Sequence, residues 1–138
     1  MCGGVIYTFN DARERVFFPN PYAQLPVRMR DGDIRLLPWG RRKEQAGHLP
    51  QGGWARLDSI KAGKWQRFHP VAVKIVVEQF MEKDQQRQSH WFDLAEGQYI
   101  QGLVASCPEE QRVYVVTTAV EEAAKLEYAI HDRWPRII

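Results

Sequence analysis

The sequence predicts an α+β fold: a β-rich single domain over residues 1–138, with a partly closed, barrel-like antiparallel sheet and two or three short helices. Three observations lead to this prediction. Many short segments rich in β-branched and aromatic residues alternate with turn-forming residues. Helix-like patterns are confined to two stretches. The 138 residues, 44% of them hydrophobic, suit one domain with one core.

The N-terminal half is predicted to be mostly extended. Residues 5–9 form a first strand, ended by the turn-forming pair Asn10-Asp11. Four prolines within residues 17–40 disfavour a helix there. Residues 26–37 are predicted to form a β-hairpin around Asp31-Gly32, a pair suited to a type I′ turn. Residues 40–53 carry four glycines, which indicates a loop, and a short helix is expected at residues 55–61.

The C-terminal half is predicted to alternate between strands and turns before a final helix. The β-branched run at residues 71–77 predicts a strand. Residues 89–105 predict two strands around a turn at Glu96-Gly97, and residues 112–120 predict another strand. Residues 121–134 have the strongest helix pattern, with Thr117 or Thr118 as candidate cap and acidic residues in the first turn. A short strand-like tail follows.

Hydropathy and cysteine usage are typical of a cytoplasmic protein. No stretch approaches the ~18–20 apolar residues of a membrane span, and no secretory pattern opens the chain, so no membrane contact is expected. Cys2 and Cys107 are expected as thiols. The four histidines lack metal-ligand spacing, so no metal or cofactor is expected. The protein is expected to be a monomer.

The charge is distributed unevenly along the chain. Residues 28–74 hold 11 Lys/Arg and 4 Asp/Glu, a balance of +7, whereas residues 78–127 hold 4 Lys/Arg and 10 Asp/Glu, a balance of −6. The basic half is interleaved with Trp39, Trp54, Trp65 and Phe68, a composition expected of a surface that binds nucleic acid. The alternative is two solvated faces that attract each other within the fold.

The second residue of the chain has a specific chemistry if Met1 is removed. Cys2 then carries a free amine and a thiol on adjacent carbons. The amine condenses with an aldehyde to an imine, and the thiol closes a five-membered thiazolidine ring. Gly3 and Gly4 would let such a terminus enter a pocket without side-chain clashes. The alternative is that Cys2 is a chance residue on a frayed end.

Short segments that follow Cys2 suggest a family. In chain order they are LLPWGRR, ARLDSI, EQFMEKD, IQGLVAS, VVTTAV and IHDRWP. Together with the initial MCG, this series resembles the SRAP (SOS response-associated peptidase) family, which includes sensors of abasic sites in single-stranded DNA. The most specific pieces are MCG and IHDRWP, which is similar to the family's IHxRMP box. The resemblance covers essentially the whole chain.

The resemblance implies covalent capture of abasic sites in single-stranded DNA, in response to DNA damage. Cys2 matches the family's nucleophile, which loses the preceding methionine and forms a thiazolidine with the ring-opened abasic sugar. Glu82 stands in the place of the glutamate of the GFYEW motif, a general acid/base, and His131 matches the catalytic histidine of the IHxRMP box. The residues implied at the DNA are Arg56 and Arg133 at phosphates, Trp39, Gly40 and Trp54 near the DNA surface, and Arg41 and Arg42 as added cations.

The chain departs from the family motifs at several positions. Gly4 stands where the family has an arginine, Trp54 where it has an asparagine, and Lys83 where it has an aromatic residue. Two alternatives stay open: a diverged relative that binds single-stranded nucleic acid without catalysis, and a cysteine peptidase limited to self-removal of Met1. Whether the chain is an enzyme, of a peptidase or lyase-like type, is also open.

Overall fold

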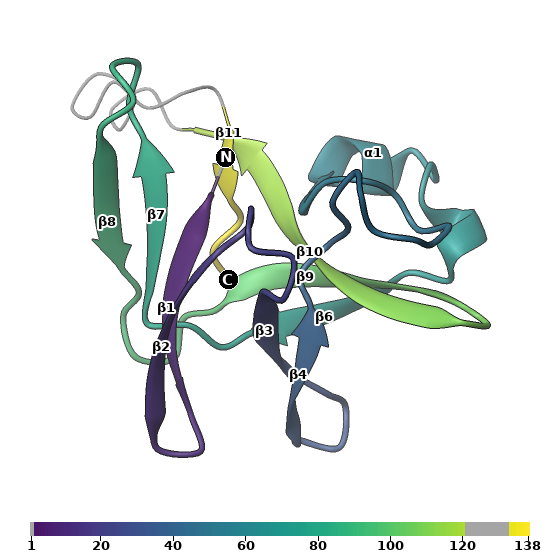
Figure 1. Cartoon of the computed structure of the whole chain (residues 1–138), viewed down its shortest axis with the longest axis horizontal. Coiled ribbons are helices and arrows are strands. Elements are labelled where there is room, and N and C mark those ends of the chain that lie inside the picture. The colour runs from purple at the N-terminus through teal and green to yellow at the C-terminus, as the bar shows by residue number, and fades with distance from the viewer. Residues whose placement is uncertain (1, 121–132) are drawn as a thin grey trace.

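The computed structural model describes residues 2–120 and 133–138. Within these ranges the chain is strand-rich, with one short α-helix and one 3-10 helix (Figure 1). The elements are β1 (Gly4–Phe9), β2 (Ala12–Phe17), β3 (Gln24–Arg28), β4 (Ile34–Pro38), β5 (Trp54–Arg56), α1 (Leu57–Lys61), η1 (Gln66–Phe68), β6 (Val71–Ile75), β7 (Gln79–Lys83), β8 (Ser89–Asp93), β9 (Ile100–Cys107), β10 (Glu110–Ala119) and β11 (Arg133–Pro135).

The strands form two sheets. The four-stranded sheet has the order β2-β1-β7-β8, and all its neighbouring strands are antiparallel. The seven-stranded sheet has the order β11-β10-β9-β6-β3-β4, with β5 added parallel to β10. Figure 1 shows β8, β7, β1 and β2 together on one side of the molecule and the longer β9 and β10 crossing the other side.

The two sheets share one hydrophobic core. Val5, Tyr7 and Phe80 of the four-stranded sheet are in the same buried cluster as Val27 and Val113 of the seven-stranded sheet. This burial removes apolar surface of both sheets from water at once, so each sheet stabilises the other. The described residues therefore form a β-rich single domain, as the sequence predicts.

The predicted barrel-like sheet differs from the observed arrangement. The strands are divided between two sheets, and neither sheet closes into a barrel. A single parallel bridge joins Trp39, just after β4, to Val113 of β10, and the Gly40 N–H donates to the Val113 carbonyl at 2.8 Å. This bridge thus joins the segment after the edge strand β4 to β10, the strand next to β11 at the other end of the sheet, without a continuous ladder.

The helix predictions are correct only in part. The predicted helix at residues 55–61 is α1, which begins at Leu57 because Trp54–Arg56 pair with β10 as a strand. The predicted helix at residues 121–134 falls mostly outside the described residues. Its last two residues, Arg133 and Trp134, belong to β11, so its predicted C-terminal end is wrong.

The predicted hairpin at residues 26–37 is confirmed, but its turn is not of type I′. The pairing of Arg28 with Ile34 leaves a longer loop over residues 29–33, and Gly32 has a φ of 90° whereas Asp31 has no positive φ. The turn with two successive positive φ angles lies instead at Asn10 and Asp11, at 49° and 64°. It connects β1 to β2, a strand that the sequence analysis missed.

Candidate functional site

Cys2 lies at the entry to β1, in the core between the two sheets. Its side chain is fully buried, and its Sγ lies 3.4 Å from the Gly4 carbonyl oxygen. The Trp54 Nε1–H donates to the Cys2 carbonyl oxygen at 2.7 Å. The next residue is held on both sides, since the Gly3 N–H donates to Met81 and the Gly3 carbonyl accepts from Phe18, each at 3.1 Å. Cys2 is therefore not on a frayed end.

The charge of Glu82, a residue of β7, affects the pKa of the Cys2 thiol. Glu82 is 1% exposed, and it lies on the same face of β7 as the core residue Phe80, because alternate residues of a strand share a face. Burial raises the pKa of the Glu82 carboxyl to about 7. Burial, together with the charge of Glu82, raises the pKa of the Cys2 thiol to about 12. The site thus holds a neutral thiol beside a carboxyl that titrates near neutral pH.

A histidine that the sequence analysis left unassigned is paired with Glu82 across the β7–β8 hairpin. His90 is the cross-strand partner of Glu82, so the two side chains lie on the same face. The His90 Nε2 lies 2.9 Å from the Asp84 Oδ2, and this contact is the main reason that the pKa of Asp84 is lowered. This pairing follows from the register of the β7–β8 hairpin, which places residue 82 opposite residue 90.

A pocket of about 630 Å³, hereafter the Cys2 pocket, opens at Gly3, the residue after Cys2, whereas the buried side chains of Cys2 and Glu82 are not among its lining residues. Gly3, which follows Cys2, and Trp54, which binds the Cys2 carbonyl, both line it. Two cationic residues, Lys83 at the end of β7 and Arg87 in the following turn, also line this pocket. Its remaining lining residues are Phe17, Phe18, Pro19, Met81 and Asp84.

Trp39 and Arg42, two residues that the sequence analysis places at the DNA, are interior residues. Trp39 is fully buried, and its Nε1–H donates to the Gly53 carbonyl at 3.0 Å. Arg42 is 7% exposed and donates to the carbonyls of Phe18 and Trp39 at 2.6 and 2.7 Å. Neither side chain has a free face for a nucleic acid.

Gly40 and Arg41 also have structural roles. Gly40 has a φ of 55°, and a Cβ there would lie 2.1 Å from the Gly52 carbonyl oxygen, so no larger residue fits. Arg41 donates to the carbonyls of Leu49 and Gln45 at 2.7 and 2.8 Å. Arg41 and Arg42 therefore hold the loop of residues 40–53 in place rather than offering their guanidinium groups to solvent.

Arg56 and Arg133 lie on the two sides of Thr117 in β10. Thr117 pairs with Arg56 of β5, and its carbonyl accepts from Arg133 at 2.6 Å. Arg56 is exposed and forms an ion pair with Asp58 at 2.8 Å, which lowers the pKa of Asp58 to about 2. Trp54 and Arg56 share a face of β5, but Arg56 lines a separate surface pocket together with Asp58, Ser59 and Lys64. His131 lies outside the described residues.

Two further findings concern residues 2–120 and 133–138 only. No three His, Cys, Asp or Glu side chains gather there in a way that could hold a metal ion. No helix in those ranges has the length and apolar character needed to cross a bilayer.

The raised pKa of Glu82 predicts a pH-dependent stability. Between its ordinary pKa of 4.5 and about 7, the folded protein holds a proton that the unfolded chain has lost. The free energy of unfolding is therefore expected to fall as the pH rises through this range, by about 3 kcal/mol, and to level off above it. Urea denaturation of wild type and Glu82→Gln at pH 5 and pH 8 measures this. The dependence should be much weaker in Glu82→Gln and unchanged in Glu78→Gln.

Neither models of known protein families nor curated protein sequences give a match to this chain.

Proposed function

We propose that this protein, once Met1 has been removed, captures abasic sites in single-stranded DNA by forming a thiazolidine with Cys2. The SRAP resemblance suggests this reaction, and one structural observation carries it. The Cys2 thiol lies within the electrostatic reach of a buried carboxyl, Glu82, whose pKa is about 7. A carboxyl that is half protonated at neutral pH is suited to give and take protons in successive steps.

The reaction needs one proton donor and one proton acceptor. The free amine of Cys2 adds to the C1′ aldehyde of the ring-opened sugar, and the protonated Glu82 carboxyl gives a proton to the departing hydroxyl, which leaves as water. The Cys2 sulfur then bonds to the imine carbon. Glu82, now a carboxylate, takes the thiol proton, and the electron pair of the protonated C=N bond moves onto the nitrogen, which keeps its one hydrogen and becomes the neutral ring amine. One water is released overall, and nothing is oxidised or reduced.

The surroundings of Cys2 support this assignment. The Cys2 carbonyl is held by Trp54 and the next peptide by Met81 and Phe18, so the reacting groups are positioned before substrate arrives. The Cys2 pocket, which opens at Gly3, is large enough for a deoxyribose, and Lys83 and Arg87 bring positive charge to it. Arg56 and Arg133 remain the candidate phosphate ligands.

Replacing Cys2 is expected to reduce covalent capture to background. Purified wild type, Cys2→Ala and the matched control Cys107→Ala are incubated with a single-stranded oligonucleotide that has one abasic site, and with the intact oligonucleotide. A denaturing gel should show a shifted band for wild type and Cys107→Ala on the abasic strand alone. The mass of the intact protein establishes whether Met1 is absent. A band of equal intensity in Cys2→Ala would overturn the proposal.

The complete burial of Cys2 favours a second candidate, a module that binds single-stranded nucleic acid without covalent chemistry. It predicts no shifted band in the same gel, together with binding that weakens steeply with salt and has no preference for abasic sites. Self-removal of Met1 is tested separately, by the masses of wild type and Glu82→Gln made without methionine aminopeptidase. Loss of Met1 in wild type but not in Glu82→Gln would support it.

A further inference from the structure

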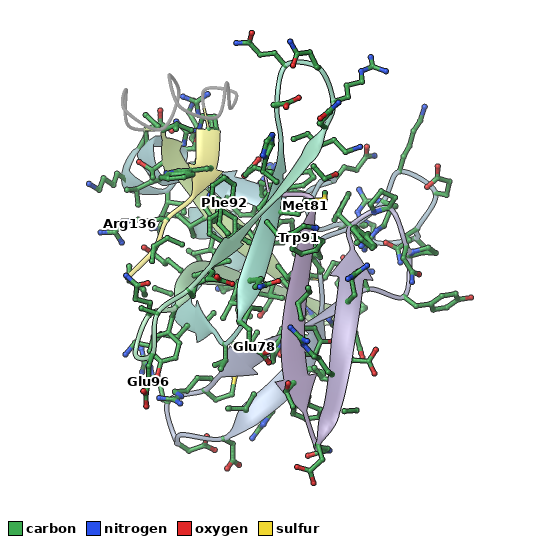
Figure 2. The ribbon with its side chains drawn as sticks, turned by 90° about the vertical axis from the view of Figure 1, so that its left-hand side faces the viewer. Glu78, Met81, Trp91, Phe92, Glu96 and Arg136 are labelled. Carbon is green, nitrogen blue, oxygen red and sulfur yellow. The ribbon has the colours of Figure 1, made fainter. Side chains whose placement is uncertain are left out.

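The outward face of the four-stranded sheet carries a row of four residues across all its strands. Gly4 of β1 pairs with Phe17 of β2 and with Met81 of β7, and Met81 pairs with Trp91 of β8. Cross-strand partners project to the same face, so the row is continuous. Figure 2 shows Met81 and Trp91 close together on this face.

The two aromatic rings of the row meet over the middle strands. The ring centroids of Phe17 and Trp91 are 6.2 Å apart with an interplanar angle of 70°. Gly4 permits this approach, because a Cβ there would lie 2.8 Å from the Phe17 ring. Phe17 is nevertheless 38% exposed. Phe17, Met81 and Trp91, hereafter the aromatic platform, thus present two ring surfaces that the core does not fully cover.

Cations surround the aromatic platform. The Arg15 guanidinium lies over the Trp91 ring, 5.6 Å from its centroid, and Arg13 and Arg15 share the face of β2 that carries Phe17. Lys83 shares the face of β7 that carries Met81. Of the acidic groups nearby, Glu78 is paired with Arg13 at 3.6 Å. Aromatic rings bordered by arginine and lysine complement a strand of exposed bases joined by phosphates.

The aromatic platform is continuous with the Cys2 pocket. Phe17 and Met81 line that pocket, as do Gly3 and Trp54, which contact the site from the other side. Lys83 is at the pocket as well. A single strand that placed one sugar beside Cys2 would therefore have its neighbouring nucleotides within reach of the platform.

We propose that the aromatic platform stacks the bases next to the lesion, while Arg13, Arg15 and Lys83 contact the phosphates of the same strand. The ligand is a single-stranded DNA segment, whose bases are free to stack, as those of a duplex are not. This inference rests on the proposed function, because it takes the strand captured at Cys2 to be the one bound here. The platform acts on reversible binding, and Cys2 acts on the covalent step.

The test uses an oligonucleotide whose abasic site is a tetrahydrofuran, which cannot open to an aldehyde, so only reversible binding is measured. Fluorescence anisotropy gives the Kd of wild type, Trp91→Leu, Trp91→Phe and the control Tyr22→Ala, an aromatic residue that is 88% exposed and is not part of the row. Loss of one stacked base predicts a Kd at least about five-fold higher for Trp91→Leu. Trp91→Phe should recover most of the affinity, and Tyr22→Ala should bind as wild type does.

A second measurement covers the case in which Trp91→Leu does not fold, as judged by circular dichroism. Arg13 and Arg15 are exposed, so Arg13→Gln/Arg15→Gln should remain folded. Loss of two phosphate contacts predicts that the slope of log Kd against log salt falls by about 1.4. An unchanged slope, a folded Trp91→Leu with wild-type affinity, or wild type that binds a duplex more tightly than a single strand would each overturn the proposal.

The two proposals fail in different ways. Wild type that binds the tetrahydrofuran strand through Trp91 but forms no adduct with a true abasic strand would contradict the covalent function and leave the platform standing. Wild type that forms the adduct while Trp91→Leu binds with unchanged affinity would contradict the platform alone. Protein that binds neither strand would overturn both.

Discussion

Glu82→Gln is expected to slow the covalent capture of an abasic oligonucleotide by about 100-fold or more at pH 7. Glutamine has almost the same shape as glutamic acid, but it neither gives a proton to the departing hydroxyl nor takes one from the Cys2 thiol. The thiol needs that base, because burial and the charge of Glu82 raise its pKa to about 12 in the chain that still carries Met1. Adduct formation under excess protein, sampled over time on a denaturing gel, gives the rate.

The pH profile separates this role from a structural one. A single carboxyl that serves first as acid and then as base predicts a wild-type rate that is greatest near its pKa of about 7 and falls on both sides. Glu82→Gln should lose the part of the profile that this carboxyl causes. The control is Glu78→Gln, since Glu78 is about half exposed and binds Thr8 and Arg13. A Glu82→Gln protein that reacts at the wild-type rate would exclude Glu82 from the chemistry.

Trp39→Ala is expected to lower the free energy of unfolding by about 3–5 kcal/mol. The indole is fully buried, and it packs edge-on against Phe18 and Trp54, at centroid distances of 5.5 and 6.4 Å. Its removal also leaves the Gly53 carbonyl without the indole N–H. Since a domain of this size has only about 5–15 kcal/mol of stability, urea denaturation should show a midpoint far below that of wild type.

Trp39→Ala also tests whether Trp39 is an interior residue or a DNA contact, with Tyr22→Ala as the control. Tyr22→Ala removes a ring that is 88% exposed, and it should change the unfolding free energy by no more than about 0.5 kcal/mol. Trp91→Leu should affect DNA binding more than stability, and Trp39→Ala the reverse. A Trp39→Ala protein with wild-type stability and weakened DNA binding would contradict the interior placement of Trp39.

Local patterns were sufficient to predict most strands. Alternating or continuous apolar residues indicated β1, β6, β9 and β10, and the Asp-Gly pair indicated the β3–β4 hairpin. The pattern failed for β2, whose Arg13, Glu14 and Arg15 are exposed and give no apolar alternation. That strand is fixed instead by its pairing with β1 and by the turn at Asn10-Asp11.

The site was predicted less completely than the fold, because several roles depend on contacts distant in sequence. The motifs predicted Cys2 and Glu82 as candidate residues, and in the structure the charge of Glu82 contributes to the raised pKa of the Cys2 thiol. Arg42 has the sequence context of a surface cation, yet its partner carbonyl on Phe18 is 24 residues away and only the folded chain shows it. The pairing of His90 with Glu82 likewise depends on the register of one hairpin. The presence of a basic residue in the sequence alone does not indicate whether its side chain faces water or a carbonyl group.

The guanidinium contacts of the loop at residues 40–53 have a consequence for local unfolding. Arg41 binds carbonyls within this loop, and Arg42 binds the carbonyls of Trp39 and of Phe18, a residue that lines the Cys2 pocket. Opening the loop would therefore leave buried guanidinium groups without acceptors and release the pocket wall at the same time. Despite its four glycines, the loop should exchange its protected amide hydrogens together with the core rather than ahead of it. The pocket wall and the core then form one cooperative unit, and this wall is not a lid that opens independently.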